Sequence, residues 1–227
     1  MVNAARWQDL RLRVISAALL IPMAVLCVWL GGLWFTAMVG MAVIAMGWEW
    51  WEMSGERPAL LLPAALYILP AGVALVWLRG NLGAGMANVL FVLVLVWGSD
   101  IGAYLAGRLI GGPKLAPAIS PGKTWSGAAG GLLAVALIGW LAALLGGGDG
   151  GGGDARRAVL VALALGVAAQ LGDLLESGIK RGFGVKDSGW IIPGHGGVLD
   201  RLDAVLVAAP VAALIGIFVA RGALIWQ

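Results

Sequence analysis

Long apolar runs separated by short polar connections dominate this chain. About seven of these runs are long enough to cross a bilayer, because roughly 20 helical residues span about 30 Å of hydrocarbon. The predicted helices cover about 14–30, 33–49, 59–78, 85–108, 126–145, 157–176 and 203–220. The runs are continuous and do not alternate with polar residues, which excludes a transmembrane β-barrel. The pattern therefore predicts an all-α, polytopic integral membrane helical bundle.

The composition supports a membrane protein and excludes a soluble globular domain. Of the 227 residues, 61% are hydrophobic and 12% are charged, and the mean hydropathy is +0.94. About a quarter of the residues in a soluble domain are charged. The 37 glycines suit close packing of transmembrane helices. The formal charge of +3 gives no reason to expect nucleic acid, and the single cysteine, Cys27, excludes an intrachain disulfide.

The distribution of lysine and arginine predicts the orientation, because these residues favour cytoplasmic connections. With seven spans and a cytoplasmic N-terminus, most of them fall on the inner side. The Arg156-Arg157 pair is the main exception. It follows the Gly/Asp stretch 146–154, which is interpreted as a flexible linker without chemistry.

Two connections are longer and more polar than the others, 109–125 and 177–202, and both fall on the predicted cytoplasmic side. We therefore divide the chain into residues 1–84, with about three N-terminal spans, and residues 85–227, a C-terminal catalytic region that contains both polar loops. Polar groups gathered at one membrane surface are where we expect the function.

The first candidate group closes the fourth predicted helix. Ser99 and Asp100 are followed by Tyr104 and Arg108, and the spacing 100, 104, 108 places three of them on one helical face. A carboxylate in an apolar span normally faces a bundle interior or a water-filled cavity. The alternative is a structural contact of Asp100 with Arg108 or Tyr104.

The loop that follows carries a candidate anion site. Lys123 lies beside the hydroxyls of Ser120 and Thr124, just before the next predicted helix. This combination suits an anionic oxygen. A Walker A phosphate loop is rejected because Pro117 occupies the position of its first glycine and no soluble strand precedes it. The alternative is a helix cap with a snorkelling lysine.

The second candidate group is denser. Polar residues recur every three or four positions at the end of the sixth predicted helix, and two aspartates share a face at the start of the last one. These residues are Asp173, Glu176, Ser177 and Lys180, then Asp200 and Asp203. Paired carboxylates from two helix ends can hold Mg²⁺, a hard cation that prefers oxygen ligands. A salt-bridge network is the alternative.

Basic residues accompany these carboxylates in numbers that predict a polyanionic ligand. They are Lys180, Arg181, Lys186 and Arg201. His195 is the only histidine, so it cannot build a zinc site alone, and it is read either as a ligand contact or as a structural residue. Its neighbours Gly196 and Gly197 allow close backbone approach, and they precede a helix N-terminus that would favour phosphate.

The run from Ser177 to Asp203 resembles the signature of the phosphatidate cytidylyltransferase family, also called CDP-diacylglycerol synthases. It reads Ser177-x-x-Lys-Arg-x-x-x-x-Lys-Asp-x-x-x-x-x-Pro-x-His-Gly-Gly-x-x-Asp-Arg-x-Asp203, without gaps. The upstream residues Ser99-Asp100, Tyr104, Gly107 and Ser120-Pro-x-Lys-Thr124 are similar to a second block of the family. The first three spans match only in hydrophobic character.

The resemblance implies transfer of the cytidylyl group of CTP to phosphatidate, with CDP-diacylglycerol and pyrophosphate as products. It implies Mg²⁺, alone or with a second cation, held first by Asp173 and Asp200, with Asp203 and Asp187 as supporting or second-metal groups. CTP, phosphatidate and the lipid bilayer are the implied partners, and a homodimer is an open alternative to a monomer. The implied location is the bacterial inner (cytoplasmic) membrane, with the active site facing the cytoplasm.

Two sets of site residues follow from the resemblance. The catalytic set is Asp173, Lys180, Lys186, Asp187, Asp200 and Asp203. The substrate-binding set is Ser99, Asp100, Tyr104, Ser120, Lys123, Thr124, Ser177, Arg181, His195, Gly196, Gly197 and Arg201.

Two rival functions are weighed against this one. A CDP-alcohol phosphotransferase would place four aspartates in one continuous helical stretch, whereas here they are spread from Asp173 to Asp203. An ion-coupled transporter could use Asp100, Asp173 and Glu176 as an ion path, but it would need polar groups that continue toward the outer side. The other helices are almost wholly apolar there.

Overall fold

The computed structural model describes residues 2–81, 83–145, 154–219 and 224–226, without the side chains of 2–11, 13 and 17. The helices of this part are α1 (Val2–Leu30), α2 (Gly32–Met53), α3 (Leu61–Gly80), α4 (Gly85–Leu109), α5 (Trp125–Leu145), α6 (Ala155–Gly182) and α7 (Leu199–Phe218). A short 3-10 helix, η1 (Pro58–Leu60), precedes α3, and two strands, β1 (Lys114–Ala116) and β2 (Ser120–Thr124), pair antiparallel. The predicted linker 146–154 falls outside the described residues except for Asp154.

Six helices of the described part are long and apolar enough to cross a membrane, namely α2, α3 with η1, α4, α5, α6 and α7. The predicted helical membrane bundle is therefore confirmed. The apolar part of α1, Val14–Leu30, is shorter than these six, so a seventh span stays a prediction.

The polar segment predicted as a loop over 177–202 is shorter in the structure, because both flanking helices extend into it. Helix α6 continues to Gly182, and α7 begins at Leu199. Lys180 reaches back to Glu176 one turn earlier, and Lys180 and Arg181 in the last turn interact favourably with the helix dipole. The segment 109–125 also differs from an irregular loop, because it contains the β1–β2 hairpin.

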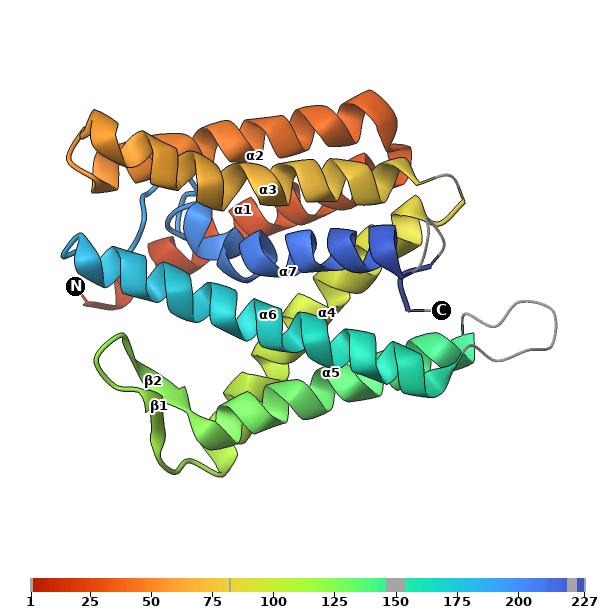
Figure 1. The fold of residues 1–227 in the computed structure, drawn as a ribbon. Coiled ribbons are helices and arrows are strands. Elements are labelled where there is room, and N and C mark those ends of the chain that lie inside the picture. The colour runs from red at the N-terminus through yellow and green to blue at the C-terminus, as the bar shows by residue number, and fades with distance from the viewer. Residues whose placement is uncertain (1, 82, 146–153, 220–223, 227) are drawn as a thin grey trace.

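Both polar segments lie at one end of the bundle, as predicted. Figure 1 shows the hairpin, the C-terminal end of α6 and the N-terminal end of α7 on the same side of the molecule. Helices α2 and α3 form an antiparallel pair beside α1, α6 and α7 run alongside them, and α4 crosses obliquely to meet α5. Helix α6 packs against both α5 and α7, so it connects the hairpin side to the rest of the bundle.

Small residues bring α4 and α5 into close contact, as expected for membrane helices. A Cβ atom at Gly130 would lie 2.2 Å from the Cβ of Ala106 and 2.8 Å from the carbonyl oxygen of Gly102. A Cβ atom at Gly102 would likewise lie 2.7 Å from the carbonyl oxygen of Gly130. The backbones therefore touch at this crossing, which positions the hairpin between the two helices.

We predict that Gly130→Ala destabilises the protein by about 1–3 kcal/mol, because the added methyl group overpacks the α4–α5 contact. Gly40→Ala is the matched control, since a Cβ atom at Gly40 meets nothing within 4 Å. Thermal unfolding in detergent measures both variants. Equal melting temperatures for the two would contradict the assignment of α4–α5 as a glycine-dependent contact.

Candidate active site

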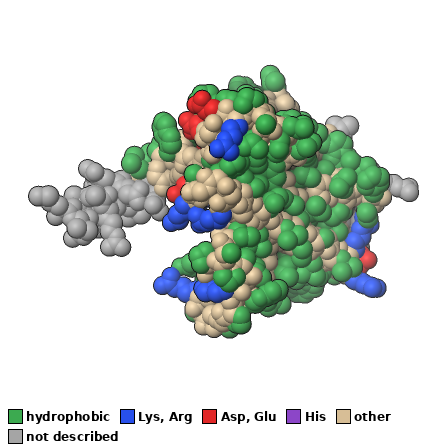
Figure 2. All heavy atoms as spheres, turned by 60° about the vertical axis from the view of Figure 1, so that its left-hand side comes forward, with side chains coloured by type: hydrophobic (Ala, Val, Ile, Leu, Met, Phe, Trp, Pro, Cys, Tyr) green, Lys and Arg blue, Asp and Glu red, His purple; other side chains and the backbone are tan. Residues whose placement is uncertain are grey.

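A polar cavity of about 600 Å³ lies between α4, the hairpin with the start of α5, and α6. Its lining includes the predicted residues Ser99, Asp100, Tyr104, Lys123, Thr124 and Asp173. The structure therefore joins the first candidate group to the start of the second. Figure 2 shows a hollow on this face with lysine and arginine side chains on both of its edges, in a surface that is otherwise largely hydrophobic.

The closest link across the cavity is an ion pair. Lys123 Nζ, on β2, lies 2.5 Å from Asp173 Oδ2, on α6. The side chains are 25% and 31% exposed, but the Lys123 Nζ atom itself is buried. The charge of Lys123 also acts on Asp100 and Asp203. A lysine that faces several carboxylates at the edge of a cavity is placed to meet an incoming anion.

The other predicted residues of the hairpin have structural contacts. Thr124 Oγ1 accepts a hydrogen bond of 3.0 Å from the backbone N–H of Gly127, so Thr124 caps α5. Ser126 Oγ donates to the carbonyl oxygen of Gly111, which ties the end of α4 to the start of α5. Ser120 begins β2 opposite Ala116 and does not line the cavity. The sequence allowed two interpretations of Thr124, an anion site or a helix cap. The structure shows the helix cap.

Tyr104 and Arg108 form the contact expected from their spacing. Arg108 Nη1 donates a hydrogen bond of 2.7 Å to Tyr104 Oη, and the guanidinium lies 5.9 Å from the centre of the tyrosine ring. Both residues line the cavity and are exposed. Asp100 instead interacts electrostatically with Asp173 and Lys123. Arg108 therefore pairs with Tyr104, whereas Asp100 faces Asp173 and Lys123.

The second candidate group is centred on Lys180. Its Nζ lies 2.8 Å from Glu176 Oε2 on the same helix and 2.6 Å from Asp200 Oδ1 on α7. Glu176 is fully buried. Asp200 also accepts hydrogen bonds from the backbone N–H groups of Ser188, at 3.0 and 3.1 Å, and of Gly197, at 3.1 Å. Asp200 thus fixes both ends of the loop between α6 and α7.

A buried residue that the sequence analysis missed completes this loop. Glu49, on α2, accepts hydrogen bonds from the backbone N–H groups of Val198, at 2.7 Å, and Leu199, at 2.8 Å. It also accepts one of 3.1 Å from Ser188 Oγ, and its exposure is 0%. The predicted phosphate site at this helix N-terminus, beside Gly196 and Gly197, is therefore corrected, because a carboxylate of the chain already occupies it. The signal was present, since a glutamate within an apolar span is unusual.

The glycine at 197 is required by the same arrangement. A Cβ atom there would lie 1.9 Å from Ser188 Oγ and 2.7 Å from Glu49 Oε2. Close backbone approach was expected at this glycine, and the groups that approach it in the structure are Glu49 and Ser188. Trp50, the residue after Glu49, is 4% exposed and packs inside against Tyr67 and Phe183.

His195 and Arg201 hold the loop from its outer side. His195 Nδ1 lies 2.8 Å from Ser16 Oγ on α1, and the same hydroxyl donates to the carbonyl oxygen of Pro193 at 3.1 Å. Arg201 Nε donates to the carbonyl oxygen of His195 at 2.9 Å. These contacts give His195 a structural role, which was one of its two interpretations from the sequence. A contact with a ligand stays a prediction.

The remaining predicted residues lie at the same end of the bundle. Arg181 donates to the carbonyl oxygens of Ile119 in the hairpin, at 3.3 Å, and Val185. Lys186 and Asp187 are exposed on the α6–α7 loop, and Ser177 is half-buried on α6. Arg181 therefore ties the hairpin to α6 a second time, after the Lys123–Asp173 pair.

The predicted metal ligands Asp173 and Asp203 lie close enough to interact electrostatically, but they do not form a complete coordination site among the described residues. The charges of Asp173 and Asp100 both act on Asp203, whose Oδ1 accepts a hydrogen bond from the N–H of Ala204. Among the described residues, no group of three or more His, Cys, Asp or Glu side chains is arranged to hold a metal ion. The Mg²⁺ ligands therefore stay a prediction.

Comparison with known proteins gives consistent matches. Residues 59–219 match the sequence model of the cytidylyltransferase family. The chain is 36% identical to the phosphatidate cytidylyltransferase of Brucella suis, over 92% of this chain and 93% of that protein. It is 36% identical to that of Rickettsia bellii, over 89% of each, and 40% identical to that of Staphylococcus epidermidis, over 67% of this chain and 56% of that protein.

We predict that Glu49→Ala lowers the free energy of unfolding by about 3 kcal/mol or more, because it leaves three buried donors without their charged acceptor. Glu52→Ala is the control, since Glu52 is exposed on the same helix. Thermal or denaturant unfolding in detergent measures the difference. If both variants unfold alike, Glu49 does not hold the α6–α7 loop.

Proposed function

The chain belongs to the cytidylyltransferase family, and from this premise we propose how its residues transfer the cytidylyl group of CTP to phosphatidate. The products are CDP-diacylglycerol and pyrophosphate. The rival transporter and CDP-alcohol phosphotransferase functions are not favoured by this membership. The observation that carries the proposal is the Lys123–Asp173 pair, which joins the hairpin to α6 across one cavity.

The polar cavity is assigned to CTP. Its volume of about 600 Å³ falls within the range of about 300–1,000 Å³ that small-molecule sites occupy. Lys123 and Arg108 supply positive charge on its lining, and Ser99 and Tyr104 supply hydroxyl groups. Arg181, Lys186 and Arg201, at the same end of the bundle, are assigned to phosphates that extend beyond the cavity.

The charge balance of the site fits a divalent cation. Five carboxylates, of Asp100, Asp173, Glu176, Asp200 and Asp203, stand against three cations, Lys123, Lys180 and Arg108. This excess of negative charge would repel a nucleotide triphosphate, and carboxylate oxygens are the ligands that Mg²⁺ prefers. We assign Mg²⁺ to Asp173 and Asp200, with Asp203 in support. When bound, Mg²⁺ would neutralise phosphate charge and polarise a phosphoryl oxygen.

In the reaction, a phosphate oxygen of phosphatidate attacks the α-phosphorus of CTP. The new P–O bond forms as the bond to the β-phosphate breaks, and pyrophosphate leaves with the electron pair. A phosphate monoester has its second pKa near about 6, so this nucleophile is mostly ionised at neutral pH and needs no strong base. The work of the protein is then to position two polyanions and to stabilise the charge that develops on pyrophosphate.

The lysines are placed for that role. Lys123 and Lys180 are each held by carboxylates, which fixes their positions before substrate binds. Preorganised positive charge of this kind stabilises a transition state more than a mobile side chain would. Lys123, at the edge of the cavity, is assigned to the CTP phosphates, and Lys180, between α6 and α7, to the reacting phosphates.

The setting is proposed to be the bacterial inner membrane, with this end of the bundle in the cytoplasm. Basic residues are concentrated there, as in cytoplasmic connections generally. The diacyl tails of the lipid would stay in the bilayer while its phosphate reaches the site. CTP would enter from the aqueous side.

The purified protein tests this function directly. We expect it to form CDP-diacylglycerol from labelled CTP and phosphatidate only when Mg²⁺ is present, and Asp173→Asn to lower kcat on the order of 100-fold. Asp154→Asn is the control, because Asp154 caps the distant start of α6. A folded wild-type protein that forms no product defeats the proposal, and full activity of Asp173→Asn removes this carboxylate from the metal site.

A second pair of variants tests the hairpin. Lys123→Ala should raise KM for CTP about tenfold or more, because it removes a charged contact with phosphate, worth about 1.5–3 kcal/mol. Lys114→Ala is the control, since Lys114 is exposed on the neighbouring strand. Steady-state kinetics at saturating phosphatidate measure both. An unchanged KM for CTP in Lys123→Ala would return this lysine to a structural role.

A further inference from the structure

A second recess lies beside the active site, between α3 and α6. It is an open, apolar groove of about 580 Å³, lined by Trp50, Leu66, Tyr67, Leu175, Ile179 and Phe183 among others. Leu66 is 68% exposed and Leu175 is 50% exposed, so the groove opens on the lipid-facing side of these helices. The apolar pattern of α3 by itself predicts only a membrane span.

The groove and the polar cavity lie on opposite faces of α6. Gln170 and Asp173 line the cavity, whereas Leu175 and Ile179 line the groove. With about 100° of rotation per helical residue, these two pairs point in roughly opposite directions. Glu176 and Lys180 fall on the face of α6 between these two pairs. The acidic cluster therefore separates the polar cavity from the apolar groove.

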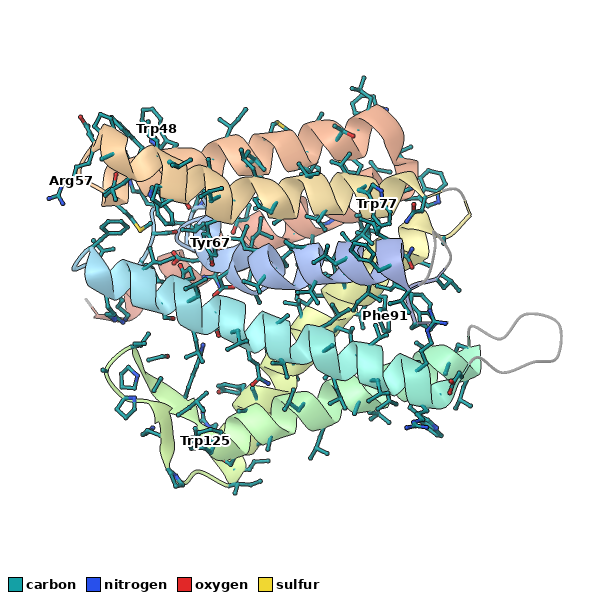
Figure 3. The ribbon with its side chains drawn as sticks, in the orientation of Figure 1. Trp48, Arg57, Tyr67, Trp77, Phe91 and Trp125 are labelled. Atoms are coloured by element: carbon teal, nitrogen blue, oxygen red, sulfur yellow. The ribbon has the colours of Figure 1, made fainter. Side chains whose placement is uncertain are left out.

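Tyr67 places a polar group at the inner wall of the groove. Its hydroxyl is buried and has no hydrogen-bond partner among the described residues. The charges of Glu176, Asp203 and Asp173 nevertheless act on it, so it lies at the edge of the acidic cluster. The ring is fixed by Trp50, whose ring centre is 6.0 Å away, and Figure 3 shows Tyr67 between α3 and the start of α7.

A buried hydroxyl without an acceptor is costly and uncommon in folded proteins. None of the nearby carboxylates of the described residues accepts a hydrogen bond from it, so the donor is available to an oxygen brought by a ligand. An apolar channel that leads from the lipid to such a donor fits an amphiphile whose head group carries oxygen acceptors. Lys180, which bridges Glu176 and Asp200, supplies the positive charge that an anionic head group needs there.

We propose that the groove between α3 and α6 receives an acyl chain of phosphatidate, and that the Tyr67 hydroxyl donates a hydrogen bond to its phosphate. Phosphatidate and CTP then reach the acidic cluster from opposite faces of α6. This assignment rests on the proposed function and adds the lipid side of the site to it. Tyr67 is a substrate-binding residue in this arrangement, contributed by an N-terminal span.

The hydroxyl is tested with Tyr67→Phe, which keeps the ring and its packing on Trp50. In mixed micelles, we expect KM for phosphatidate, as a mole fraction, to rise at least about fivefold, with KM for CTP changed less than twofold. A smaller rise, or an equal rise in both constants, overturns the contact. If the wild-type protein itself forms no CDP-diacylglycerol, the proposed function fails, whereas an active wild type with an unaffected Tyr67→Phe defeats this inference alone.

The groove is tested with Leu66→Trp, whose indole would fill it. Leu133→Trp is the matched control, because Leu133 is a similarly exposed leucine, 73% against 68%, on α5 and outside both recesses. We expect Leu66→Trp to lower kcat/KM at least fivefold more for dipalmitoyl than for dihexanoyl phosphatidate, and Leu133→Trp to show no such difference. Equal effects on both chain lengths in Leu66→Trp, or the same selectivity in Leu133→Trp, overturn the groove as the acyl-chain site.

Discussion

Charges inside the apolar helices of this protein are paired, and these pairs hold the bundle together at its polar end. A charged side chain in a membrane-spanning helix is tolerated only where it is paired or reaches water. Lys180 meets this requirement by joining Glu176 on α6 to Asp200 on α7, at 2.8 and 2.6 Å. Removing one partner would leave the others buried and uncompensated, which costs about 3–5 kcal/mol. The groups that give this end of the bundle its chemistry therefore also hold α6 and α7 together.

The same principle fixes the segments around α6. Glu49 crosses from α2 to bind the first backbone N–H groups of α7, and Lys123 crosses from the hairpin to pair with Asp173. Three parts of the chain that are far apart in sequence thus converge on one charged cluster. For a transfer between a water-soluble nucleotide and a lipid, this placement is required, because one substrate arrives from water and the other cannot leave the bilayer.

The sequence predicted the helices well because apolar runs of the right length have one stable form in lipid. It predicted the cluster from Asp173 to Asp203 because polar residues recur there every three or four positions, and because the run from Ser177 to Asp203 resembles the family signature. The role of a residue could not be predicted from the sequence where that role depends on a partner far along the chain. Glu49 reads as the end of a span next to tryptophans, and its function depends on N–H groups about 150 positions later. The hairpin was missed because Ser120-Pro-Gly-Lys-Thr124 has no alternation of apolar residues. Tyr67 was missed because its hydroxyl matters only once α3 packs on α7 and forms a groove with α6.

We propose that CTP and a divalent metal ion bind in the cavity between α4, the hairpin and α6. The decisive test is a structure of the protein with a non-hydrolysable CTP analogue and Mn²⁺, with the metal located by its anomalous signal. We expect the metal peak beside Asp173 and the triphosphate against Lys123, because both residues line the cavity. A nucleotide bound elsewhere, with the Lys123–Asp173 pair intact and no metal nearby, would contradict it.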